Sequence, residues 1–284
     1  MLTSSSTRRV NGVDLHVVEA GPEDGPLIIL LHGFPDFWWG WRRQIEPLVK
    51  QGFFVILPDQ RGYNLSDKPS GVDAYNVDAL AADVVGLADM YGRFAFRLVG
   101  HDWGGIVAWW TAVRFPTRVE RLVILNAPHP DVWKSLKRRR FRQALRSTYV
   151  GFFQLPRLPE ALLKAGNFAL LRLSLTRTSG PGAFTPEDIA RYVQAWAQPG
   201  ALTAMINYYR ALRHKPKGPP RRVRSATLVI WGTRDIFLEQ AVAQASLDLC
   251  DRGESFFLDT ATHWVHLEEA KTVNTAAIRF FKAD

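Results

Sequence analysis

Short apolar runs alternate with segments of helical spacing along most of the chain. The runs are short and continuous enough for strands buried on both faces, and they span residues 27–31, 53–57, 94–99 and 119–125. Apolar side chains recur three and four positions apart between them, which indicates helices, at residues 39–49, 78–91 and 105–115. This alternation predicts an α/β fold with a mostly parallel central sheet and helices on both faces.

The alternation begins after a hairpin and is interrupted once. Val10-Asn11-Gly12-Val13 carries the Asn-Gly pair of a tight hairpin turn. The alternation stops at Pro128-His129-Pro130. It resumes with strands at residues 227–231 and 256–258 and a final helix at 272–281. The segment between has helical stretches separated by Pro and Gly, so we expect residues 130–222 to form an all-helical cap, inserted between core segments 1–129 and 223–284.

The stretch from Gly100 to Gly105, Gly-His-Asp-Trp-Gly-Gly, joins an apolar run directly to a helix. It has the form of a nucleophile elbow, a turn so sharp that its central residue is strained and its neighbours must be small. Asp102 stands where serine is usual. A carboxylate is ionised at neutral pH and attacks without a base, so Asp102 suits displacement at saturated carbon. The alternative is a Gly-rich turn with an ordinary Asp.

The remaining members of a catalytic triad follow in the order that such an elbow requires, acid before histidine. Asp235 follows the strand at 227–231, and His263 precedes the last helix. Asp131, just past the strand at 119–125, is the rival for the acid. His266 lies three residues after His263, but two histidines alone make a poor metal site, so we expect no metal.

A second turn, Leu31-His32-Gly33-Phe34-Pro35, follows the first central strand. In enzymes with this elbow, that position supplies half of an oxyanion hole. The backbone N–H groups of Phe34 and Trp103 are therefore predicted to point at one oxygen, the carbonyl oxygen of an Asp102 ester. An ordinary buried strand-end turn is the alternative.

Composition and charge set limits on class and partners. The 284 residues are 47% hydrophobic, carry a net charge of +9 and include one cysteine, Cys250. One cysteine excludes an internal disulfide, and the polar start lacks the apolar segment of a secretory signal, so we expect a cytoplasmic protein that spans no membrane. The basic residues concentrate at 134–146 and 210–224. We interpret them as solvated helix faces and a linker, and not as a nucleic-acid surface.

From about Val13 to Phe281 the chain resembles the epoxide hydrolases of the α/β-hydrolase superfamily. The matching motifs are His32-Gly33-Phe34-Pro35, Asp59 to Tyr63 with Leu65 to Pro69, Gly100 to Gly105, Asn126 to Pro130, Asn207 to Arg210, and Thr262-His263-Trp264. In that family two cap tyrosines activate the epoxide oxygen, and the resemblance assigns this role to Tyr149 and Tyr209. Asn64 stands where the family commonly has Gly, which we expect to change loop packing and not chemistry.

Helical phase agrees with this choice of tyrosines. Tyr209 shares a stripe with apolar neighbours, while Tyr208 points elsewhere. The members of that stripe are Leu202, Met205, Ile206, Tyr209 and Leu212. Tyr149 likewise shares a stripe with Phe141 and Leu145. Two packed core tyrosines are the alternative.

The resemblance implies a two-step hydrolysis without cofactor or metal. Asp102 opens the epoxide to an alkyl ester, and water activated by His263, itself oriented by Asp235, releases a vicinal diol. We expect Trp38 and Phe152, among other aromatic residues, to line a pocket for a small apolar epoxide. Haloalkane dehalogenases, fluoroacetate dehalogenases and a non-catalytic ligand-binding protein of the same fold remain rivals. Both a monomer and a homodimer remain open.

Overall fold

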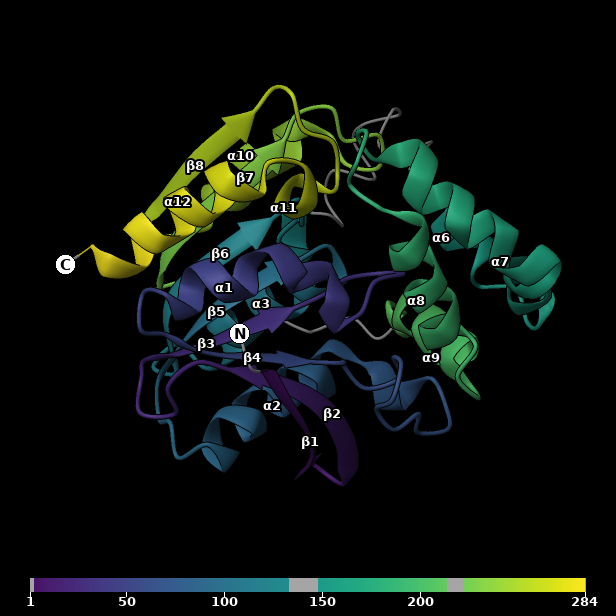
Figure 1. Ribbon diagram of the computed structural model, residues 1–284, viewed down its shortest axis with the longest axis horizontal. Coiled ribbons are helices and arrows are strands. Elements are labelled where there is room, and N and C mark those ends of the chain that lie inside the picture. Colours follow the sequence, from purple (N-terminus) through teal and green to yellow (C-terminus); the bar gives the residue numbers. More distant parts are fainter. Residues whose placement is uncertain (1–2, 133–147, 214–221, 284) are drawn as a thin grey trace.

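The computed structural model describes residues 3–132, 148–213 and 222–283, which contain one eight-stranded sheet (Figure 1). The strand order is β1-β2-β4-β3-β5-β6-β7-β8. The strands are β1 (Thr3–Val10), β2 (Val13–Ala20), β3 (Leu27–Leu31), β4 (Phe54–Pro58), β5 (Phe96–His101), β6 (Val119–Leu125), β7 (Ala226–Gly232) and β8 (Gly253–Leu258). The pairs β1–β2 and β2–β4 are antiparallel and all others are parallel. The predicted α/β fold with a mostly parallel sheet is confirmed.

Helices cover both faces of this sheet. On one face lie η1 (Trp38–Trp41), α1 (Arg42–Val49), α11 (Val265–Glu268) and α12 (Ala270–Lys282). On the other lie η2 (Asp73–Tyr75), α2 (Val77–Met90), α3 (Trp103–Arg114) and α10 (Gln240–Leu247). Successive residues of a strand point to opposite faces, so Ile28 and Leu30 pack with α1 and α12, while Ile29 and Leu31 pack with α2 and α3. Both faces are buried, which is why β3 is apolar at every position.

The predicted hairpin turn is confirmed, and two strands begin at least two residues away from the expected position. Val10 pairs with Val13 across Asn11 and Gly12, whose φ angles are +49° and +78°. Strand β5 begins at Phe96 and not at residue 94, because Phe94 is 69% exposed and lies under Arg118. Strand β8 begins three residues earlier than expected. It is an edge strand with an exposed first half, so its start has no apolar pattern.

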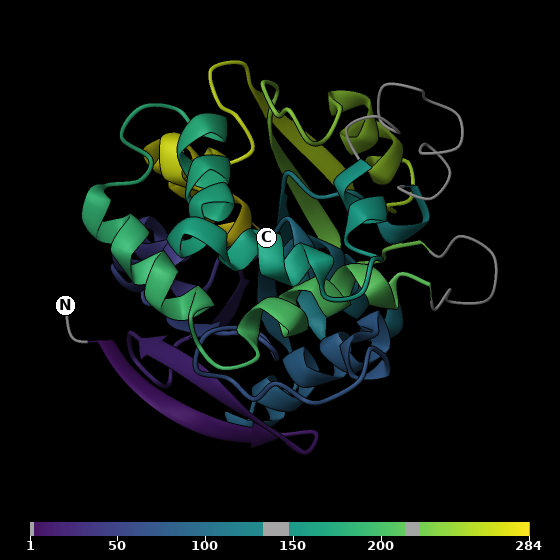
Figure 2. The same ribbon diagram turned by 90° about the vertical axis from the view of Figure 1, so that its right-hand side faces the viewer.

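The described residues between β6 and β7 form four helices, which lie together at the carboxyl ends of the parallel strands (Figures 1 and 2). These cap helices are α6 (Thr148–Phe152), α7 (Leu158–Thr178), α8 (Pro186–Trp196) and α9 (Ala201–Ala211). The described residues from 126 to 222 contain no strand. Helix α7 is divided by four non-helical residues, Ala165 to Phe168. None of the described helices is long and apolar enough to cross a membrane.

Polar contacts fix α8 to the core. The indole N–H of Trp39 donates to Asp188 Oδ1 at 2.6 Å, and the Arg42 guanidinium donates to Asp188 Oδ2 at 2.7 Å. The indole N–H of Trp196 donates to the carbonyl of Pro35 at 2.6 Å. Charge-assisted bonds of this length hold their partners closely. Helix α8 is therefore docked on the segment from Pro35 to Arg42, which follows β3.

Candidate active site

Asp102 occupies a strained turn between β5 and α3. Its φ and ψ angles are +50° and −120°, a region that non-glycine residues rarely adopt. The next turn of chain lies against β3 so closely that a Cβ on Gly104 would be 2.1 Å from the carbonyl oxygen of Leu31. This is the geometry of the predicted elbow, and it places the Asp102 side chain at the carboxyl end of the sheet.

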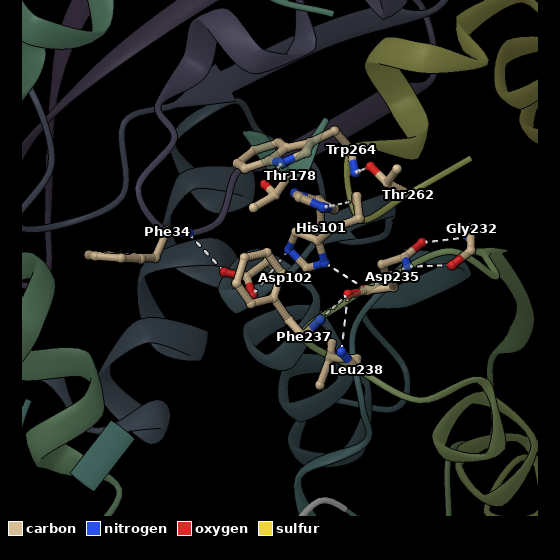
Figure 3. A network of polar contacts seen from close by, with 12 residues as sticks. Phe34, His101, Asp102, Thr178, Gly232, Asp235, Phe237, Leu238, Thr262 and Trp264 are labelled. Atoms are coloured by element: carbon tan, nitrogen blue, oxygen red, sulfur yellow. Dashed lines mark hydrogen bonds and ion pairs between the residues drawn. The ribbon is translucent and has the colours of Figure 1, made fainter. Parts of the chain in front are cut away.

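Hydrogen bonds to both of its oxygens hold the Asp235 carboxylate beside His263. Its Oδ2 lies 2.7 Å from His263 Nδ1 and accepts a bond of 2.7 Å from the amide of Asn126. Its Oδ1 accepts from the backbone N–H groups of Phe237 and Leu238 at 2.7 and 3.0 Å (Figure 3). The carboxylate is thus fully engaged and fixes the direction of the imidazole. Asn126 belongs to one of the motifs found in the sequence, but its contact with Asp235 was not predicted.

The Asp102 carboxylate lies between the turn after β3 and the Nε2 side of the His263 ring, which is the side away from Asp235. Asp102 Oδ2 is 3.6 Å from His263 Nε2, and Asp102 Oδ1 accepts a hydrogen bond of 2.8 Å from the Phe34 N–H (Figure 3). A Cβ on Gly33 would lie 2.4 Å from Asp102 Cβ, so the approach requires glycine there. Trp103 is the first residue of α3, where backbone N–H groups have no carbonyl one turn earlier. The predicted acid, base and nucleophile are therefore in contact in one row.

Two carboxylates set the protonation of His263. Burial lowers the pKa of this imidazole, but the charges and hydrogen bonds of Asp235 and Asp102 outweigh burial and raise the pKa to about 10. His263 is therefore an imidazolium at neutral pH. Removal of one of these two negative charges would lower the His263 pKa.

Tyr149 of α6 and Tyr209 of α9 lie close together above Asp102. Their ring centroids are 5.8 Å apart, and the Tyr209 ring also packs edge-on against Phe34 at 5.2 Å and Trp103 at 5.1 Å. Burial, and after it nearby negative charge, raises the pKa of both phenols above the ordinary value. Both hydroxyls are therefore protonated at neutral pH and able to donate hydrogen bonds.

Asp102, His263 and both tyrosines line one cavity of about 210 Å³. Its other lining residues are Phe34, Phe153, Leu163, Leu170, Leu171, Ser174, Phe237 and Trp264. The wall is thus mostly apolar, with the polar groups gathered at Asp102 and at the tyrosines.

The two predicted pocket residues Trp38 and Phe152 do not line this cavity. Trp38 lies in η1 between the rings of Phe37 and Trp39. The cavity is lined instead by Phe153, the residue that directly follows α6. The Phe153 N–H donates to the Tyr149 carbonyl at 2.9 Å, so the two side chains, four residues apart, lie on the same side of the chain. That spacing was visible in the sequence.

Other residues singled out in the sequence lie elsewhere. Asp131 lies beside His129, with 4.0 Å between Oδ2 and Nδ1. The Tyr208 hydroxyl donates to the Arg61 carbonyl at 2.8 Å and does not reach the cavity. Asn64 has a φ of +41°, and its amide donates to Asp59.

The basic run at 134–146, with Phe141 and Leu145, lies outside the described residues. From the second run, Arg210 is a structural residue. It pairs with Glu160 at 2.7 Å and donates to the carbonyl of Phe153.

Comparison with known proteins agrees with this geometry. The family model for the alpha/beta hydrolase fold matches residues 26–270. The chain is 46% identical to AB hydrolase superfamily protein YfhM of Bacillus subtilis over 96% of both chains, and 35% identical to Epoxide hydrolase 4 of Mus musculus over 96% of this chain and 78% of that one. The crystal structure of Bacillus megaterium epoxide hydrolase with an inhibitor has a TM-score of 0.89 at 30% identity, over 98% of this chain and 100% of that one. The chain therefore belongs to the epoxide hydrolase family of the α/β-hydrolase superfamily.

Proposed function

We propose that this protein hydrolyses small apolar epoxides to vicinal diols through an alkyl ester of Asp102. One observation carries the proposal: the carboxylate of Asp102 and the phenols of Tyr149 and Tyr209 line the same mostly apolar cavity. An epoxide needs both, a nucleophile for carbon and a proton donor for the ring oxygen. The apolar wall around them suits a substrate without charge.

In the first step Asp102 attacks an epoxide carbon, and the bond between that carbon and the ring oxygen breaks. Tyr149 and Tyr209 hydrogen-bond to that oxygen, and one of them gives it a proton. The product is a hydroxyalkyl ester of Asp102. The Phe34 N–H already holds Asp102 Oδ1, which orients the carboxylate before the substrate arrives.

The second step begins because the ester has no charge. Loss of the Asp102 charge removes one of the two groups that raise the His263 pKa, so His263 can return its proton to the tyrosinate left by the first step. His263 is then neutral and can act as a base while Asp235 orients it. His263 takes a proton from water, and the resulting hydroxide attacks the carboxyl carbon of the ester. The N–H groups of Phe34 and Trp103 stabilise the oxyanion, and the diol leaves with the alkoxide oxygen protonated.

The remaining parts of the proposal concern the setting of this reaction. Residues 130–222 act as the cap that carries both tyrosines over the core. The reaction needs the substrate and water, and no cofactor or metal ion. The lone cysteine, Cys250, is buried and free, which is compatible with work in the reducing cytoplasm.

The test is an assay of the purified protein on styrene oxide and a short alkyl epoxide, beside haloalkanes of matched size. We expect diol from the epoxides and no halide release. Asp102→Asn should abolish diol formation, because an amide is a poor nucleophile. Halide release without diol formation would instead identify a dehalogenase, and inactivity on both classes would favour a binding protein.

A further inference from the structure

Three buried polar side chains converge beside His263, outside the cavity that Asp102 lines. Asp36 lies just before η1, His101 ends β5, and His266 lies in α11. Their exposed fractions are 1%, 0% and 0%. One ligand atom from each lies within 4.8 Å of the others. Neither the cavity nor the proposed reaction uses these groups.

The atoms that face one another have no hydrogen-bond partner. This holds for Asp36 Oδ2, His101 Nδ1 and both ring nitrogens of His266. His266 Nε2 is 3.9 Å from Asp36 Oδ2, beyond hydrogen-bond distance. Burying an unsatisfied polar atom is costly, and buried polar atoms in folded proteins are nearly always satisfied. Three such residues at one point indicate a group that binds all of them.

Hydrogen bonds to neighbouring groups leave one atom of His101 and one of Asp36 with a lone pair that can bind a cation. His101 Nε2 lies 2.8 Å from the carbonyl oxygen of His263, which can only accept, so Nε2 carries the hydrogen and Nδ1 keeps its lone pair. Asp36 Oδ1 accepts from the Phe37 N–H at 2.7 Å and the Tyr192 hydroxyl at 2.6 Å, which leaves Oδ2 free. Metal-binding histidines and carboxylates are typically oriented by such outer hydrogen bonds.

The types of ligand atom agree with this arrangement. The free Asp36 oxygen supplies negative charge at the same point. Two imidazoles and one carboxylate are a donor set that suits zinc and neighbouring divalent metals.

The spacing is compatible with a metal ion after a small contraction. Atoms separated by up to 4.8 Å have a common centre no more than about 2.8 Å from each, whereas zinc bonds to nitrogen and oxygen are about 2.0 to 2.2 Å. Each side chain therefore needs to move by less than about 1 Å. We propose that Asp36, His101 and His266 form a binding site for a divalent transition metal ion, with zinc as the best fit.

The site would have a structural role. His101 Nε2 donates to the backbone carbonyl of His263. An ion bound at His101 Nδ1 would therefore fix the His101 ring and, through this hydrogen bond, the backbone of His263. The Tyr192 hydroxyl on Asp36 would connect the same ion to α8 of the cap helices. The ion does not reach the cavity, so the proposal is independent of the epoxide reaction.

The experiment measures zinc in protein expressed in zinc-supplemented medium and then dialysed against a chelator. Mass spectrometry of the elements should find about one zinc per chain in the wild type and less than about a tenth of that in Asp36→Asn and His266→Gln. His16→Gln is the matched control, since His16 also pairs with a buried carboxylate, Asp59, at 2.7 Å but has no third ligand. This control should keep its zinc.

Two results would overturn the proposal: wild-type protein with no more zinc than His266→Gln, or His266→Gln with a full equivalent. If the variants do not fold, wild-type crystals decide the question. An anomalous-scattering peak at the zinc edge between the three side chains would support the site. Density for a water molecule there, without an anomalous signal, would exclude it.

Discussion

At the scale of single residues, the central fact is that His263 lies between two carboxylates. Nδ1 is 2.7 Å from Asp235 and Nε2 is 3.6 Å from Asp102. Because its pKa is raised to about 10, the resting His263 holds a proton, which in the proposed mechanism it must release before it can activate water. Because the proposed ester removes the Asp102 charge, the chemistry of the first step prepares the base for the second.

The raised pKa of His263 predicts a pH dependence of stability. A folded pKa of about 10 against an unfolded value of 6.5 means that the stabilisation is fully present below pH 6.5 and is lost as pH rises through 10. Between these limits the free energy of unfolding of the wild type should fall relative to His263→Gln, by at most about 1.4 kcal/mol per pH unit. Urea unfolding of both proteins at several pH values measures the difference. A difference independent of pH would contradict the assignment.

The two tyrosines predict a graded loss of the first step. Removing one proton donor typically slows a reaction about 10²- to 10⁴-fold, and two donors to one oxygen partly replace each other. Tyr149→Phe and Tyr209→Phe should therefore each slow ester formation, and the double variant should lose it almost completely. Single-turnover kinetics with excess enzyme isolates that step. Tyr208→Phe is the matched control, and a double variant that opens epoxides at the wild-type rate would remove both tyrosines from the mechanism.

At the scale of elements, the apolar pattern of the sequence was sufficient to locate a strand where both of its faces are buried. Strands β3 and β6 lie at their expected positions. The pattern failed where burial is one-sided or absent, as at the exposed start of β8. Local spacing carries no signal for contacts with distant parts of the chain, which decide such boundaries.

At the end of α6, a shift of one residue decides which phenylalanine lines the cavity. Phe153 lines the cavity and Phe152 does not, although the two are adjacent. Phe153→Leu should enlarge the cavity and raise kcat/KM for a bulky aryl epoxide relative to a small alkyl epoxide by about tenfold. Phe152→Leu, the matched control, should leave that ratio within about twofold. Equal effects of both changes would place the substrate elsewhere.

At the scale of the whole molecule, chain order allowed the triad to be predicted, because the carboxyl ends of parallel strands meet at one edge of the sheet. The same reasoning could not find Phe237, Leu163 or Leu171, which reach the cavity through the docking of cap helices and loops. Nor did it bring Asp36, His101 and His266 together, because the order of strand ends does not tell which way these side chains point. These contacts depend on packing between segments far apart in the sequence.

The last prediction concerns the covalent intermediate, on which the roles of core and cap both depend. In His263→Gln the nucleophile and tyrosines remain while the base is absent, so ester should form and persist. Intact-protein mass spectrometry should find an adduct equal to protein plus epoxide, located in the peptide that contains Asp102. His16→Gln, which changes a histidine outside the cavity, should accumulate no adduct.

Isotope labelling decides which atom water attacks. If water attacks the carboxyl carbon of the ester, a single turnover of wild-type enzyme in heavy-oxygen water should leave the label in Asp102, because the diol departs with an oxygen that began in the carboxylate. Label in the first-turnover diol, with unlabelled protein, would mean direct attack of water on the epoxide. Asp102 would then be at most a base, and His263→Gln would trap nothing.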